Sequence, residues 1–165
     1  MSQHEVEAVL WVRCQQATFD TLHGKSRGQY HIAFPDDDRI HDFFDGVPRV
    51  DTSKGGYEMA VPLEPFEGSE PVPAHELGVR YMGLGSSRKD WNIRSQRPAT
   101  AYPLWRPGRG VPKTYRQGWR EYAVLARDAD DHFHARWISS TAFQHLPSWI
   151  RLVLESANSG ARRYP

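Results

Sequence analysis

Residues 24–44 have the sequence GKSRGQYHIAFPDDDRIHDFF, which predicts a loop, a strand and a short helix in succession. The loop is polar and interrupted by glycine, and the β-branched and aromatic residues of Tyr30–Phe34 favour a strand after it. Pro35 ends this strand, and the three aspartates that follow supply N-capping carboxylates for a helix over Arg39–Phe44. The apolar side chains on one face of that helix are Ile40, Phe43 and Phe44.

Further short strands are expected on both sides of this stretch, at residues 6–14, 57–63, 77–82, 91–94, 119–127 and 132–138. The last two flank an acidic turn, Asp128–Asp131, and predict a hairpin. A helical turn is expected at 140–144, and the spacing of apolar residues predicts a helix over 147–157. We therefore expect a mostly β (α+β) fold, a small β-barrel or pseudobarrel of about seven short strands with two or three helices.

Composition limits the class of protein. The chain has 165 residues, 39% hydrophobic and 25% charged, with a net charge of +1, which predicts one globular domain over residues 1–165. Disordered tails, a membrane span and a disulfide scaffold are not expected. The single cysteine, Cys14, suits a reducing cytoplasm, and the acidic N-terminus is unlike a signal peptide. A cytoplasmic protein without membrane contact is predicted.

The charge is distributed very unevenly along the chain. Residues 1–78 contain 6 basic and 14 acidic side chains, residues 79–120 contain ten basic ones and a single acid, and residues 121–165 contain five of each. Eight of the ten central cations are arginines, which make forked contacts to phosphate and to guanine. Aromatic residues are interleaved with them, and this combination favours nucleic acid as a partner.

Two polar, cationic loops are the main candidates for contact with nucleic acid, residues 24–29 and residues 86–97. Their arginines can bind guanine edges, and their carboxamides can bind adenine. Trp91 has two interpretations that the sequence leaves open, a contact to the nucleic acid or a core anchor. The full set of predicted nucleic-acid-binding residues is Lys25, Arg27, Gln29, Arg88, Lys89, Trp91, Asn92, Arg94, Arg97, Tyr102, Trp105, Arg106, Arg109, Lys113 and Arg116.

No catalytic or metal-binding motif is recognisable. His132 and His134 would lie on one face of a strand, but two ligands do not make a metal site. Glu58 and Glu64 lie near a candidate strand, yet neither is followed two positions later by the lysine that a restriction-type nuclease uses. We therefore predict no catalytic residues, no metal and no cofactor, and we do not expect catalytic activity from this chain.

Two segments, GKSRGQYHIAFPDDDRIHDFF at residues 24–44 and RYMGLGSSRKDWNIRSQRPATAYPLW at residues 80–105, resemble the N-terminal DNA-binding domain of the EcoRII restriction endonuclease. The resemblance implies a pseudobarrel in which two arms grip the major groove. It assigns Lys25, Arg27 and Gln29 to the first arm, and Arg88, Lys89, Asn92 and Arg94 to the second. The proline-rich residues 101–112 have no place in that pattern, and the nuclease domain to which the family member is usually fused is not in this chain.

The leading hypothesis is a sequence-specific module that binds double-stranded DNA, within a restriction or phage-defence system. One alternative is a reader of modified bases or RNA, in which Tyr102, Trp105 and Trp119 stack on an extruded base. Another is a divergent metal-dependent nuclease that uses His132, His134 and nearby acids. A protein-interaction module with a basic face is a further alternative. The sequence leaves open whether the chain forms a homodimer and whether it acts with a fused or partner nuclease.

Overall fold

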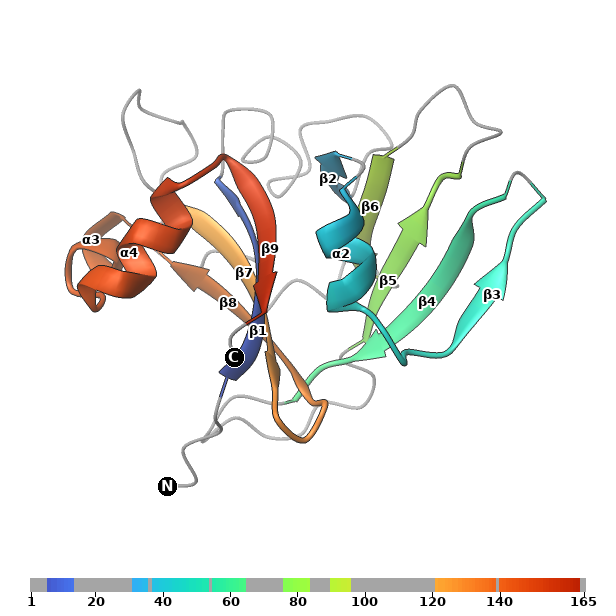
Figure 1. Ribbon diagram of the computed structural model, residues 1–165, viewed down its shortest axis with the longest axis horizontal. Helices are drawn as coiled ribbons and strands as arrows, with labels where there is room; N and C mark the ends of the chain where they lie inside the picture. Colours follow the sequence, from blue (N-terminus) through green and yellow to red (C-terminus); the bar gives the residue numbers. More distant parts are fainter. Residues whose placement is uncertain are drawn as a thin grey trace.

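The computed structural model describes residues 6–13, 31–35, 37–53, 55–64, 76–83, 90–95, 121–138 and 140–163, which form two antiparallel sheets (Figure 1). The four-stranded sheet has the order β8 (Phe133–Ile138), β7 (Tyr122–Asp128), β1 (Val6–Arg13) and β9 (Ser159–Arg163). The five-stranded sheet has the order β2 (His31–Pro35), β6 (Asp90–Ser95), β5 (Glu76–Tyr81), β4 (Tyr57–Pro62) and β3 (Arg49–Asp51).

Three helices accompany the sheets. Helix α2 (Asp38–Phe43) lies between the two sheets, whereas α3 (Ser140–Gln144) and α4 (Ser148–Glu155) lie on the far side of the four-stranded sheet (Figure 1). Asp37 caps α2, because its carboxylate accepts a hydrogen bond from the backbone N–H of Arg39 at 2.9 Å. Of the predicted capping aspartates, Asp37 is the cap, and the predicted apolar face of Ile40, Phe43 and Phe44 is confirmed.

The four-stranded sheet is covered on both faces, which explains why its central strands are almost continuously apolar. On β7, Ala123 and Leu125 belong to the core between the sheets, and Tyr122 and Val124 belong to a second core under α3 and α4. A strand buried on both faces loses the polar alternation of a half-exposed one. The predicted β7–β8 hairpin is confirmed by its antiparallel register, with Tyr122 opposite Ile138.

The five-stranded sheet buries only one of its faces against the described residues, and its strands alternate accordingly. On β4, Tyr57, Met59 and Val61 are buried and face α2 and the other sheet, while the intervening residues point outward. Gly56 precedes this strand at a position where a Cβ atom would overlap the carbonyl oxygen of Tyr81, so only glycine fits.

The mostly β, α+β class is confirmed, but the expected small barrel of about seven strands is wrong, because the part of the chain that the structure describes does not form a closed barrel. The two sheets have separate hydrogen-bond ladders, joined only by an isolated bridge between Leu63 and Phe133 within the described residues. A barrel needs a continuous ladder, and here the edge strands β8 and β9 form no ladder with the edge strands β2 and β3 of the other sheet.

Two strands were not predicted. The described residues contain nine strands rather than about seven, and the additional ones are β3 and β9. Both are short edge strands, and the residues of β3 are all exposed. An edge strand contributes few side chains to a core and therefore lacks the apolar alternation that makes a strand recognisable.

Candidate nucleic-acid interface

The outer face of the five-stranded sheet carries a row of side chains that crosses from β3 to β6. Register places Glu58 of β4 opposite Arg80 of β5, and Arg80 opposite Asn92 of β6. Because strand residues alternate between faces, these three side chains share the face that points away from α2. At the end of the row, Val50 of β3 lies opposite Glu58 and is largely exposed.

Arg80 and Glu58 form an ion pair on this face, with 2.6 Å between the Arg80 Nη2 and the Glu58 Oε1. Each side chain is 43% exposed, so water screens the attraction. Exposed pairs of this kind stabilise a fold by about 0–1 kcal/mol. The guanidinium of Arg80 is therefore held in place in the free protein but can exchange its partner at little cost.

A shallow hollow of about 260 Å³ lies next to this pair. Its floor includes Ala60 and Gly78, which are opposite each other on β4 and β5 and have small or no side chains. Val50, Glu58 and Arg80 are among the residues that border it. The outer face thus offers a flat surface with one cation and one anion at its rim.

Asn92 continues the row onto β6. Its amide oxygen is buried and has no hydrogen-bond partner among the described residues, although the side chain as a whole is half-buried. An unpaired buried acceptor costs about 1–3 kcal/mol, which makes this position unusual in a folded protein. Arg94 lies two residues later on the same strand, at the register position opposite Gly78 and His31.

The register also shows at which end of the β2–β6 pair each of the two predicted loop segments joins the sheet. Residues 24–29 precede β2, whose first residue, His31, pairs with Arg94 near the end of β6. Residues 86–89 instead precede Asp90, at the other end of β6. The two segments therefore join the sheet at opposite ends of the β2–β6 pair, about 13 Å apart for the four residue steps from Asp90 to Arg94.

Trp91 lies in the core, so the structure corrects its place among the predicted nucleic-acid-binding residues. Its side chain is 0% exposed and packs among aromatic rings, with centroid distances of 4.5 Å to His41, 5.0 Å to Tyr81 and 5.4 Å to Tyr57. The core-anchor interpretation is the one that this packing supports. The alternation that turns Asn92 outward turns Trp91 inward.

Most of the other predicted site residues fall outside the described residues. They are Lys25, Arg27, Gln29, Arg88, Lys89, Arg97, Tyr102, Trp105, Arg106, Arg109, Lys113 and Arg116, and the same holds for Cys14 and Trp119. The sequence had singled out Glu58 only as a nuclease candidate and Arg80 only as one cation among ten. Alternation along β4 indicates that Glu58 points outward, but its pairing with Arg80 depends on the register between two strands.

His132 and His134 have a structural role at the β7–β8 turn. The Nε2 of His134 lies 2.8 Å from Oδ2 of the buried Asp128, whose Oδ1 accepts the backbone N–H groups of Asp130 and His132. Burial raises the pKa of Asp128, but the hydrogen bonds from His134 and from the two N–H groups outweigh it and hold the pKa below its ordinary value. No three metal-ligating side chains within the described ranges are arranged to hold an ion.

Comparison with protein-family models, with curated proteins and with solved structures gives no match to this chain. The resemblance to the EcoRII domain therefore stays a prediction. None of the helices described here is both long enough and apolar enough to cross a membrane.

Proposed function

We propose that the chain is a sequence-specific module that binds double-stranded DNA through the outer face of the five-stranded sheet and the basic segments attached to it. The observation that carries this proposal is the position of the basic segment, residues 79–120, which has ten cations and one acid. It begins within β5 and contains all of β6, so two of its cations, Arg80 and Arg94, belong to neighbouring central strands of one sheet. The pseudobarrel class and a restriction or phage-defence setting rest on the resemblance to the EcoRII domain.

The dimensions of β6 support the proposal. Basic residues precede this strand at Arg88 and Lys89 and follow it at Arg97, and the strand between them spans about 17 Å. The major groove of B-DNA is about 12 Å wide, so cations at the two ends of β6 suit the phosphates on the two sides of the groove. Phosphate contacts of this kind set the register, and carboxamide and arginine side chains discriminate between bases.

The Glu58–Arg80 ion pair predicts how each of its two charges affects DNA binding. A phosphate that approaches Arg80 competes with Glu58, and the exposed pair stabilises the free protein by less than about 1 kcal/mol. A charge-assisted bond between the guanidinium and a phosphate can therefore replace it. Glu58 should weaken DNA binding, whereas Arg80 should strengthen it.

The test is fluorescence anisotropy with the full chain and a labelled random-sequence duplex at 50 to 200 mM salt, followed by selection from a duplex library. If five or six cations meet phosphates, the slope of log K against log salt is about −5. Arg88→Gln should relax discrimination at one base pair at a cost of about 1–3 kcal/mol. Absence of binding at 50 mM salt, or a library without enrichment, refutes sequence-specific DNA binding. Tighter binding of methylated duplex or single-stranded RNA favours the alternative reader function.

Three matched variants test the surface itself. Arg80→Gln should weaken binding about three- to tenfold and reduce the salt slope by about 1, and Glu58→Gln should strengthen binding by up to about fivefold. Arg163→Gln changes the net charge by the same amount as Arg80→Gln but lies on β9 in the other sheet. Equal effects of the two arginine variants would indicate a general charge effect and would contradict the proposed surface.

A further inference from the structure

Strand β3 forms one edge of the five-stranded sheet, well away from the four-stranded sheet (Figure 1). It consists of Arg49, Val50 and Asp51, which are all exposed, and β4 is its one pairing partner among the described strands. The other side of an edge strand presents backbone N–H and C=O groups that can pair with a further strand. The residues of β3 determine which strand fits there.

Backbone hydrogen bonding shows which groups of β3 point away from β4. The N–H of Thr52 donates to the backbone oxygen of Gly56 at 2.9 Å, which identifies these two residues as a hydrogen-bonded pair. Such pairs alternate with non-hydrogen-bonded pairs along an antiparallel ladder, so Val50 directs its backbone groups to β4. Arg49 and Asp51 therefore direct their N–H and C=O groups to the free edge.

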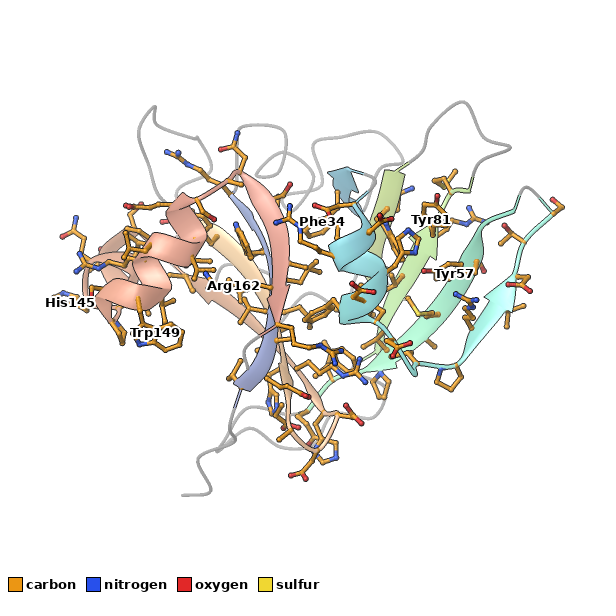
Figure 2. All side chains as sticks on the ribbon, in the orientation of Figure 1. Phe34, Tyr57, Tyr81, His145, Trp149 and Arg162 are labelled. Carbon is orange, nitrogen blue, oxygen red and sulfur yellow. The ribbon has the colours of Figure 1, made fainter. Side chains whose placement is uncertain are left out.

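The side chains of β3 carry opposite charges on one face of the sheet and an apolar group on the other. Arg49 and Asp51 are two residues apart and share the inner face, whereas Val50 points to the outer face. Arg49 lies over the ring of Tyr57 on β4, with 4.6 Å between its Cζ and the ring centroid; Figure 2 labels Tyr57. Val50 is 72% exposed, more than any other large hydrophobic side chain in the described part of the chain.

Two copies of β3 are complementary to each other in one register. When they run antiparallel about a two-fold axis at Val50, Arg49 of each copy lies opposite Asp51 of the other. The residues with outward N–H and C=O groups are then opposite each other, and each such pair exchanges both of its backbone hydrogen bonds. The two Val50 residues meet at the axis as a non-hydrogen-bonded pair, in which Cα atoms are about 4.5 Å apart and the side chains touch.

The charges of β3 disfavour the other ways of pairing. A parallel in-register arrangement, or an antiparallel one centred on Arg49 or on Asp51, places like charges opposite each other. Proteins often use charged side chains to keep edge strands from pairing. The opposite charges of β3 do not repel a second copy in the register centred on Val50, so this edge lacks that protection.

We propose that β3 is a homodimer interface, at which a second copy of this chain pairs edge to edge and joins the two five-stranded sheets into one. The two-fold axis is perpendicular to the sheet, so the outer faces of both copies lie on the same side. Because only three residues of each copy pair, the dimer is weak and forms at high protein concentration. The pairing needs no DNA, so it is independent of the proposed function.

Sedimentation velocity of the full chain at concentrations up to about 1 mM tests the proposal. The weight-average sedimentation coefficient should rise with concentration towards the value of a dimer. Val50→Lys places two cations at the axis and should weaken association at least about tenfold, and the exposure of this side chain leaves the fold intact. A parent chain that stays monomeric at 1 mM overturns the proposal, and so does undiminished association of Val50→Lys.

Charge reversal tests the register. Arg49→Asp leaves two acids on β3 and Asp51→Arg leaves two bases, so each variant alone should associate about tenfold more weakly than the parent. An equimolar mixture of the two variants should associate as the parent does, because every acid then faces a base. Arg163→Asp, on β9 in the other sheet, is the charge-matched control and should associate like the parent. A mixture no better than the separate variants, or a control weakened as much as Arg49→Asp, overturns this pairing.

Discussion

Replacing Arg127 by methionine tests how the four-stranded sheet holds α2. The guanidinium of Arg127, on β7, is 8% exposed, and its Nη1 donates to the backbone oxygens of Phe43 at 2.9 Å and Asp45 at 2.7 Å. These carbonyl groups lie at the C-terminal end of α2, where a helix has no backbone donors of its own for them. Nε and Nη2 bind Asp131 at 3.0 and 2.8 Å.

The expected loss of unfolding free energy for Arg127→Met is about 3 kcal/mol. A hydrogen bond to a charged donor contributes about 1.5–3 kcal/mol, and the bond to Phe43 is fully buried, whereas the bond to Asp45 is only partly so. The ion pair with Asp131 adds little, because that carboxylate is 68% exposed. Methionine keeps an apolar side chain of similar length but loses the guanidinium, whose Cζ lies 5.3 Å from the centroid of the Phe133 ring.

Urea unfolding followed by tryptophan fluorescence measures this loss, provided that the slope of free energy against urea is unchanged. Asp131→Asn is the matched control, because it removes the ion pair but leaves both carbonyl contacts intact, and it should cost less than about 1 kcal/mol. A loss below 1 kcal/mol for Arg127→Met refutes the reasoning. So does an Asp131→Asn variant that is destabilised as much as Arg127→Met.

Two further substitutions test the turn and the aromatic core. The pKa of Asp128 is lowered in the folded state, so the unfolded chain binds a proton first and stability falls as the pH decreases below about 4. Asp128→Asn should therefore be less stable than the parent protein at pH 7. In urea titrations, it should also lose less unfolding free energy than the parent between pH 5 and pH 2. An equally steep loss in the variant contradicts the role assigned to Asp128. Trp91→Ala should cost about 3–5 kcal/mol in unfolding free energy, because it empties a fully buried site. A variant with parental stability and weakened DNA binding would instead identify Trp91 as a contact residue.

The interior strands and the helices were predictable because their signals are local. Leu10 and Leu125 lie in apolar runs that predict a buried strand. Val153 and Leu154 follow Trp149 and Ile150 at helical spacing. By contrast, β9 has the polar sequence SGARR and forms a strand because it pairs with β1 along Ala8–Val12. The residues of β9 therefore do not predict a strand by themselves, and the strand forms because β1 offers a free edge to pair with.

The candidate site was predictable in its chemistry but not in its geometry. An arginine-rich segment between residues 79 and 120 indicates an anionic partner, and period-two alternation already separates Trp91 from Asn92. Which of these two residues faces the core depends on whether α2 and the first sheet cover that side of β6. The pairing of Arg80 with Glu58 likewise depends on a register between residues far apart in sequence.

The sequence alone determined where the interior strands and the helices lie, where the charges are concentrated along the chain, and which side chains alternate together. These properties follow from backbone geometry and capping, which act over a few residues. Only the tertiary structure decided that the sheets stay separate, that Trp91 is buried, and that Arg80 pairs with Glu58. Contacts between distant segments form when the total apolar surface buried outweighs the lost chain entropy, and that balance involves all the segments at once.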